Sequence, residues 1–247
     1  MSTKKKEGSL FRIKRLDAAR PEHLFADDFR LYLCGHAGGG KTTTWINMLL
    51  SKELNFKQNF ENIIIFSPTF KGDPKFYQVK DAGVIFPEDV HTELTMEELN
   101  KIAKKQEQWI EMGAEPPRIL IVFDDCISEK MFKTTIFQNY IFRSRHWHMS
   151  ILINSQYWAS LPKKIRSNMN YIMVFQMNNN ELYDIYETIA HNNIKWPEFE
   201  MLYNYALKPD EYCPKPFLFW MGGMGNKYAK CFDEVLTIVR PTEEKKI

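Results

Sequence analysis

Short apolar runs alternate with amphipathic stretches along most of this chain. Five runs are too short for buried helices and rich in β-branched residues, so we predict buried strands over residues 31–34, 62–66, 118–125, 148–154 and 171–175. Behind the first run, Trp45, Met48 and Leu49 recur at helical spacing on one face. Because strands and helices alternate over residues 29–176, the pattern predicts a mostly parallel α/β sheet in three layers, with helices on both faces.

Residues 70–117 lengthen one connection between two predicted strands. Thr95 to Glu98 has the pattern of a capping box, and Ile102 and Trp109 continue one helical face behind it. We therefore predict a helical elaboration in this segment. Another helix is predicted from about Ser128 to Phe142.

The most informative motif is GHAGGGKT at residues 35–42, which fits the phosphate-loop pattern G-x-x-x-x-G-K-[ST] at each fixed position. Glycines tolerate positive φ, so successive N–H groups can curl around a phosphate at the start of the next helix. Lys41 would supply a mobile positive charge to the β- and γ-phosphates, and Thr42 a hydroxyl to Mg²⁺. The predicted nucleotide-binding residues are Gly35, His36, Ala37, Gly38, Gly39, Gly40, Lys41, Thr42 and Thr43.

The predicted strand over residues 118–125 ends in two carboxylates. In phosphate-loop ATPases, Mg²⁺ and the γ-phosphate lie at this carboxyl-terminal edge of the sheet, so Asp124 is the candidate acid for Mg²⁺. Asp125 would then orient and polarise the attacking water as the catalytic base, a task more often given to Glu. An exposed turn carboxylate is the alternative for Asp125.

Gln156 follows the predicted strand over residues 148–154 at the same edge of the sheet. Its amide could hydrogen-bond the attacking water or sense the γ-phosphate. A glutamine that only supports a nearby loop is the alternative. The two preceding motifs favour the sensor.

Composition narrows the class of protein. A chain of 247 residues that is 44% hydrophobic can form one large core. Its four cysteines are scattered without a C-x-x-C pair, which disfavours disulfides and structural zinc and favours a reducing compartment. No apolar stretch approaches the roughly 20 residues that cross a bilayer, so we expect an intracellular, soluble protein with no membrane span.

Several segments together resemble the genome-packaging ATPases of nucleocytoplasmic large DNA viruses. They are GHAGGGKT, ILIVFDD, residues 143–156 and residues 161–168. Similar enzymes occur in virophages and large DNA transposons, within the FtsK–HerA superfamily of P-loop DNA-pumping ATPases. The similarity spans roughly residues 29–240, since residues 216–220 and 227–233 look like the closing strand pair of that family.

The resemblance implies a three-layer P-loop NTPase of the RecA/ASCE type. A single ATPase domain is expected over residues 27–240, between a basic, flexible arm over residues 1–26 and a tail over residues 241–247. The implied cofactors are ATP and Mg²⁺. The implied partners are double-stranded DNA without sequence preference, further copies of the chain in a pentameric or hexameric ring, and capsid or portal components. The expected location is the host-cell cytoplasm, at the site of virus assembly, and the virion.

An arginine finger is also implied, which would enter the neighbouring subunit's site and neutralise charge on the γ-phosphate. Arg145 aligns with the arginine that recurs ahead of the fourth predicted strand, and Arg166 lies in a loop that could face a neighbour. The sequence ranks Arg145 first without deciding between them. Either arginine could instead lie on the surface or contact a DNA phosphate.

The stretch over residues 126–177 is locally basic, with seven Lys or Arg against Glu129 alone. A motor that moves along DNA without reading bases contacts phosphates through such side chains. Lys163, Lys164 and the pair Tyr157–Trp158 are the first candidates. The alternative places the aromatic side chains in the core or a subunit interface and leaves the lysines as solubilising groups.

Three further classes remain open beside a packaging motor. A nucleoside or nucleotide kinase would explain the phosphate loop but needs an acceptor pocket and an arginine-rich lid, which the sequence does not indicate. A non-hydrolysing nucleotide-binding scaffold would leave Asp124, Asp125 and Gln156 without a purpose. Another FtsK–HerA pump, serving conjugation, segregation or a transposon, is the nearest rival.

Overall fold

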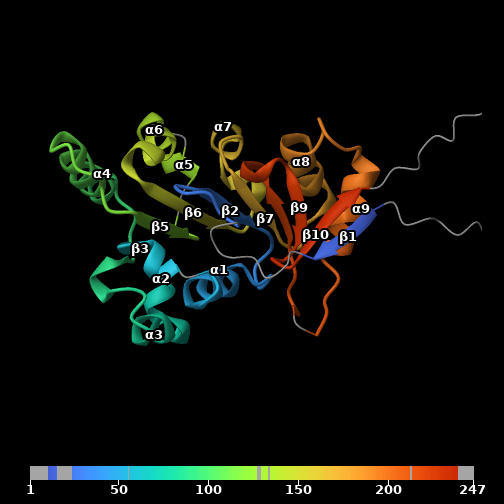
Figure 1. Ribbon diagram of the computed structural model, residues 1–247, viewed down its shortest axis with the longest axis horizontal. Helices are drawn as coiled ribbons and strands as arrows, with labels where there is room; N and C mark the ends of the chain where they lie inside the picture. Colours follow the sequence, from blue (N-terminus) through green and yellow to red (C-terminus); the bar gives the residue numbers. More distant parts are fainter. Residues whose placement is uncertain are drawn as a thin grey trace, which may run out of the picture.

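A ten-stranded sheet forms the centre of the computed structural model, which describes residues 11–15, 24–54, 56–126, 129–132, 134–211 and 213–238. Its strand order is β1-β10-β9-β8-β7-β2-β6-β5-β3-β4. The parallel strands are β2 (Arg30–Cys34), β3 (Asn62–Phe66), β4 (Val90–His91), β5 (Ile119–Asp124), β6 (Met149–Ser155) and β7 (Tyr171–Val174). An antiparallel extension follows β7 and consists of β8 (Leu218–Met221), β9 (Lys227–Lys230), β10 (Glu234–Ile238) and β1 (Phe11–Arg15) (Figure 1).

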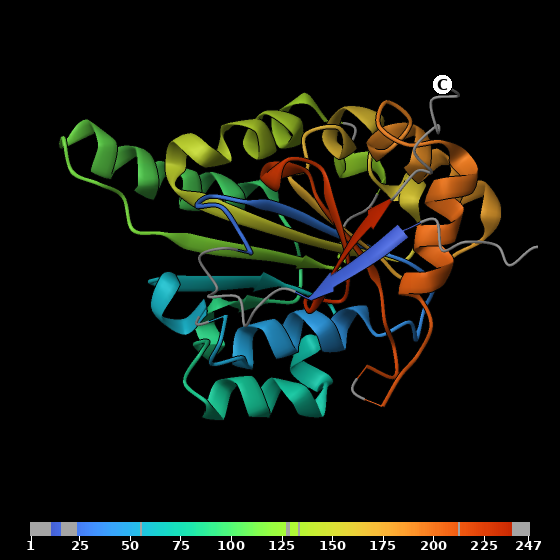
Figure 2. The ribbon, with the colours of Figure 1, turned by 45° about the vertical axis from the view of Figure 1, so that its right-hand side comes forward.

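Helices cover both faces of the sheet, so the predicted three layers are confirmed (Figure 2). One face carries α1 (Lys41–Leu50), α2 (Phe56–Asn59) and α3 (Pro74–Asp81). The other carries α4 (Met96–Glu111), α5 (Glu129–Phe132), α6 (Thr135–Arg143), α7 (Lys163–Arg166), α8 (Asn179–Ile189) and α9 (Trp196–Ala206). Short 3₁₀ turns are η2 (Phe70–Gly72), η3 (Pro87–Asp89), η4 (Ser144–Trp147), η5 (Trp158–Ser160) and η6 (Gly222–Met224).

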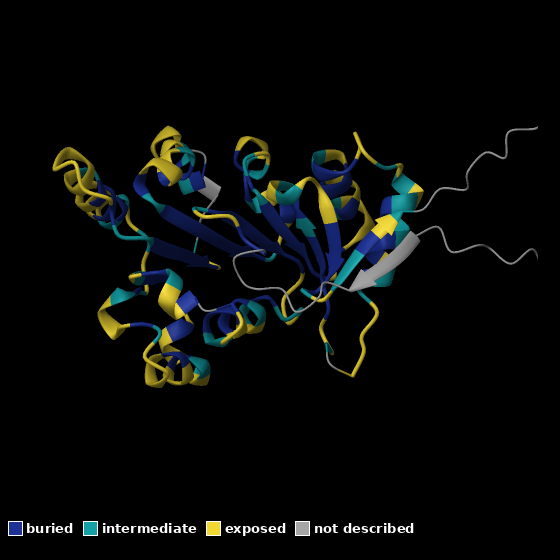
Figure 3. Cartoon of the chain, viewed as in Figure 1, coloured by how far each residue is buried: buried dark blue, intermediate teal, exposed yellow. Residues whose placement is uncertain are grey.

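The central strands are buried on both faces (Figure 3). Leu31 and Leu33 of β2 pack in the core cluster that contains Trp45, whereas Tyr32 and Cys34 pack in the cluster on the opposite face. Successive side chains of a strand point to opposite faces, so a strand covered on both sides must be apolar throughout. This explains why the five predicted strands read as continuous apolar runs, and each is confirmed to within one residue at either end.

Two helix predictions need correction. The single helix expected over residues 128–142 is divided into α5 and α6, because Thr134 starts a new helix: its hydroxyl accepts a hydrogen bond from the Phe137 amide at 3.2 Å and donates one to the Met131 carbonyl at 2.7 Å. The cap of α4 is confirmed, since the Thr95 hydroxyl accepts a hydrogen bond from the Glu98 amide at 3.2 Å. The second correction concerns the face of this helix. Trp109 of that helix is 43% exposed, because the carboxyl-terminal part of α4 extends beyond the body of the protein (Figure 1).

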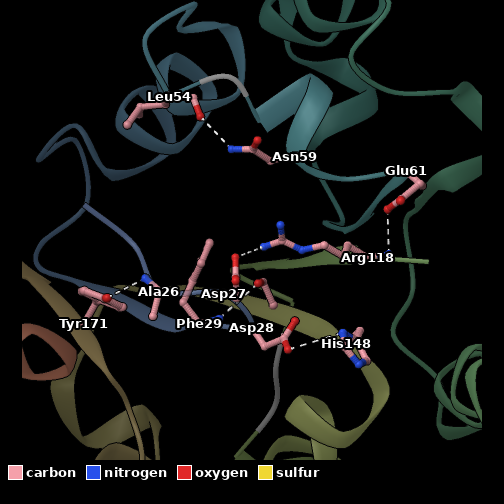
Figure 4. A network of polar contacts seen from close by, with 11 residues as sticks. Ala26, Asp27, Asp28, Phe29, Leu54, Asn59, Glu61, Arg118, His148 and Tyr171 are labelled. Atoms are coloured by element: carbon pink, nitrogen blue, oxygen red, sulfur yellow. Dashed lines mark hydrogen bonds and ion pairs between the residues drawn. The ribbon is translucent and has the colours of Figure 1, made fainter. Parts of the chain in front are cut away.

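Part of the segment predicted as a flexible arm is incorporated in the fold. Residues 11–15 pair with β10 and so occupy an edge that would otherwise offer unpaired backbone groups. Further along, the Ala26 amide donates to the Tyr171 hydroxyl at 2.8 Å, and Asp27 forms an ion pair with Arg118 at 2.7 Å (Figure 4). The three lysines at positions 4–6 and the predicted tail over residues 241–247 lie outside the described residues.

Candidate active site

The phosphate loop joins β2 to α1 and turns at its glycines. Gly35, Gly38 and Gly40 have φ angles of 150°, 72° and 102°, and Gly40 is the residue that precedes α1. Such angles suit glycine, which has no Cβ to clash with the backbone. The first N–H groups of α1 therefore follow directly on a tight glycine loop, which is the arrangement that binds phosphate.

Replacing Gly35 by alanine should destabilise the fold far more than the same change at Gly38. A Cβ on Gly35 would lie 2.6 Å from Phe175 Cβ, whereas one on Gly38 would have no atom of the described residues within 4 Å. Both sites have positive φ, so the pair separates collision from backbone strain. We expect losses of about 3 and about 1 kcal/mol in the free energy of unfolding, measured by urea denaturation. Equal losses would show that strain, and not contact with Phe175, governs Gly35.

Lys41 is only 4% exposed and folds over the loop that precedes it. Its ammonium donates to the carbonyl oxygens of Gly35 at 2.7 Å and His36 at 3.0 Å. Burial lowers the pKa of Lys41, and the nearby carboxylates of Asp125 and Asp124 oppose that shift. The lysine is thus held at the loop, within electrostatic reach of both predicted acids.

Asp124 is the most firmly held side chain of the site. It lies at the carboxyl end of β5, is 4% exposed, and accepts hydrogen bonds from the indole N–H of Trp45 and the hydroxyl of Ser67, each at 3.1 Å. The Thr42 hydroxyl donates to it at 3.4 Å, and the Asn154 amide also donates to it. Donors from α1, β6 and the end of β3 therefore fix this carboxylate beside the phosphate loop.

The donor set around Thr42 fits Mg²⁺, which prefers oxygen ligands. The Thr42 hydroxyl and a carboxylate oxygen of Asp124 lie together, and the buried side-chain oxygen of Asn154 has no hydrogen-bond partner among the described residues. Among the residues that the structure describes, no group of three or more His, Cys, Asp or Glu side chains is placed to hold a metal ion. One carboxylate, a hydroxyl and substrate phosphates are a normal set for Mg²⁺.

Asp125 and Gln156 are brought together at the same edge, from the ends of β5 and β6. The Gln156 amide donates to the Asp125 carboxylate at 3.3 Å. Asp125 has a φ of 46°, unusual for a residue other than glycine, and its amide donates to the Asn154 carbonyl at 3.2 Å. Partial burial raises the pKa of Asp125, while the Gln156 hydrogen bond and the charge of Lys41 oppose this.

The sequence reasoning missed Trp45, Ser67 and Asn154 as parts of the site. Ser67 and Asn154 are polar residues at the carboxyl ends of buried strands, which is the same signal that identified Gln156. Trp45 belongs to the apolar helical face that its spacing predicted, and its ring lies in the core. Nothing in its spacing indicates that its N–H reaches Asp124.

The two candidate finger arginines differ in their surroundings. Arg166 stacks on the Trp158 ring, 4.7 Å from its centroid, and donates to the Trp158 carbonyl at 3.2 Å, so it is engaged within its own chain. Arg145 is exposed in η4, just before β6 begins. Because η4 ends just before β6, Arg145 lies at the amino-terminal edge of the sheet, about 20 Å from the Asp124 edge along seven-residue β6.

The predicted DNA-contact residues also separate. Trp158 is fully buried and stacks on Tyr32 with ring centroids 5.4 Å apart. It therefore belongs to the core, which was the alternative to a DNA contact. Tyr157 is 60% exposed. Lys163 and Lys164 are exposed on α7, with the Lys164 ammonium 5.2 Å from the centroid of the Phe142 ring.

The glycine loop, its lysine and threonine, and an acid on a nearby parallel strand define a P-loop NTPase. Strand β6 lies between the strand that carries the loop and the strand that carries Asp124, as in RecA-like members of this class. The chain belongs to the poxvirus A32 protein family, whose profile matches residues 18–196. The family resemblance expected from the sequence is thereby confirmed.

Individual relatives are distant. Protein 075L of Invertebrate iridescent virus 6 is 26% identical over 163 residues, which cover 65% of this chain and 60% of that protein. DNA packaging protein OPG160 of vaccinia virus is also 26% identical over 163 residues, covering 63% of this chain and 56% of its own length. The chain thus spans little more than half the length of these relatives.

A solved structure supports the fold over most of the chain. B204, the DNA-packaging ATPase from Sulfolobus Turreted Icosahedral Virus, has a TM-score of 0.55 at 14% identity and covers 89% of this chain and 100% of its own. In the part of the chain that the structure describes, no helix has both the length and the apolar character to cross a membrane.

Proposed function

We propose that this protein is an ATPase that hydrolyses ATP to drive double-stranded DNA into a viral capsid. The observation that carries the proposal is the meeting of Lys41, Asp124 and the Asp125–Gln156 pair at one edge of the sheet. Membership of the A32 family and the fold shared with B204 support it. The similarity to the vaccinia virus DNA packaging protein OPG160 supports it as well.

Hydrolysis would use the residues of the site in sequence. Lys41 and the loop N–H groups bind the β- and γ-phosphates, and Thr42 and Asp124 hold Mg²⁺, which when bound neutralises phosphate charge. Asp125 accepts a proton from the attacking water, whose oxygen bonds the γ-phosphorus as the bond to the ADP oxygen breaks. Gln156 keeps the Asp125 carboxylate and the water aligned. The products are ADP and inorganic phosphate.

Arg145 is proposed as the finger supplied by a neighbouring subunit. Arg145 lies too far from the phosphate loop of its own chain to reach it, so it would act in the site of a second copy. A homo-oligomeric ring, pentameric or hexameric, would place each Arg145 beside the next subunit's nucleotide. In such a ring we assign DNA-phosphate contacts to Lys163 and Lys164, and we expect the ring to act at the site of virus assembly in the host cytoplasm, with capsid or portal components.

The test measures the ATPase rate per subunit against protein concentration, with and without duplex DNA. The rate should rise steeply as subunits assemble and rise again with DNA. Arg145→Ala should abolish the rise while ATP still binds. The matched control is Arg143→Ala, which removes an arginine that pairs with Glu107 at 3.3 Å. Phosphate transfer to a nucleoside without any effect of DNA would contradict the proposal and favour a kinase.

A further inference from the structure

A second lysine touches the phosphate loop from a distant part of the chain. Lys215 lies between α9 and β8, and its ammonium donates to the Gly38 carbonyl at 2.6 Å. Its stem covers Gly40, where an added Cβ would lie 3.1 Å from Lys215 Cβ and 3.3 Å from its Cδ. The Lys215 stem therefore leaves little room for a side chain at position 40.

The segment that carries Lys215 is fastened in place. Asp210 forms an ion pair with Lys230 of β9, and the Cys213 amide donates to the Asp210 carboxylate at 2.8 Å. The Cys213 and Cys231 sulfurs lie 2.9 Å apart, which holds the segment to the end of β9. Prolines at positions 214 and 216 restrict the backbone on both sides of Lys215. The position of this lysine is thus built into the fold.

Lys215 approaches the loop from the flank opposite to the hydrolytic groups. Asp124 and Gln156 come from β5 and β6, on one side of β2. Lys215 precedes β8, which lies beyond β7 on the other side of β2. A triphosphate whose γ-phosphate faces Asp125 extends its nucleoside end away from β5 and β6, and hence toward Lys215.

We propose that Lys215 is a second nucleotide-binding lysine, whose ammonium bonds an oxygen of the ribose–α-phosphate end of the nucleotide while it holds the loop at Gly38. The assignment rests on the proposed function, since it takes ATP as the ligand. An ammonium has three N–H donors, and the bond to Gly38 uses one of them. Lys41 bonds the carbonyls of Gly35 and His36 in the same manner, so the two lysines hold different parts of the loop.

The test compares binding of ATP, ADP and inorganic tripolyphosphate to Lys215→Met by calorimetry. Methionine keeps the stem on Gly40 and removes the charge. We expect the Kd of ATP and of ADP to rise by about tenfold, the usual effect of one exposed charge-assisted hydrogen bond, with tripolyphosphate changed less than twofold. Lys215→Arg should retain most of the affinity. The matched control is Lys227→Met, at an exposed lysine at the start of β9, on the opposite edge of the sheet.

Two results would overturn the assignment. Unchanged binding of ATP and ADP by folded Lys215→Met would show that Lys215 does not contact the nucleotide. An equal loss of affinity for tripolyphosphate would show that Lys215 only supports the loop. Lys41→Ala in the same titrations tests the proposed function separately. If Lys41→Ala binds all three ligands normally, the site itself is wrong; if it loses them while Lys215→Met does not, only the Lys215 assignment fails.

Discussion

Lys41→Ala should lower ATP turnover by at least about a hundredfold and weaken ATP binding, because it removes the one buried cation of the phosphate loop. The substitution also leaves the Gly35 and His36 carbonyls without their donor. Phosphate release should therefore be measured together with thermal unfolding, so that loss of chemistry is separated from loss of fold.

Lys52→Ala is the matched control for this experiment, since Lys52 is an exposed lysine just beyond the other end of α1. It should hydrolyse ATP at the unchanged rate. If folded Lys41→Ala hydrolyses ATP as fast as the control, residues 35–42 do not form the active site.

Asp125→Asn should still bind ATP with Mg²⁺ but hydrolyse it about 10²–10⁴-fold more slowly, the usual contribution of a general base. Asparagine keeps the size of the side chain and an oxygen that can accept from Gln156. Asp124 and Thr42 remain in place, so the binding groups are untouched. Single-turnover hydrolysis and nucleotide binding should be measured on the same preparation; weak binding with normal turnover of the bound fraction would exclude the base.

The pH profile gives an independent check on Asp125. Partial desolvation raises its pKa above the ordinary 3.8, so turnover should fall as pH decreases through this raised value and protonates the base. Gln156→Ala removes the hydrogen bond that lowers the pKa, and the acid limb should then move to higher pH. A limb unmoved in Gln156→Ala would mean that another group titrates.

The sequence predicted the central strands well because burial on both faces leaves a continuous apolar signature. It located the phosphate loop because the geometry demands glycines at fixed spacing, and Asp124 because β5 ends there. The antiparallel strand β10 carries no such signature, since it is only partly buried. Its pairing with β1 depends on a contact between the two ends of the chain.

Contacts between distant residues account for what the sequence reasoning missed in the site. Lys215 reaches Gly38 across 177 residues, and no spacing rule connects them. Trp158 stood beside Gln156 in a basic stretch and was considered for the surface, yet its ring fills the space over Tyr32. Arg166 stacks on this buried ring. The sequence did not decide between Arg166 and Arg145 as the arginine finger. The assigned roles of Asp125, Gln156 and Arg145 stay predictions until the variants are measured.

The separation of Arg145 from Asp124 has a consequence for symmetry. If one edge of the subunit donates an arginine and the opposite edge receives it, the two joining surfaces are unlike. Unlike surfaces associate head to tail, and such contacts close on themselves only in cyclic assemblies. A two-fold dimer joins identical patches and would leave both edges without their complement. Rotational closure, rather than the number of copies alone, would then decide whether a subunit's site is complete.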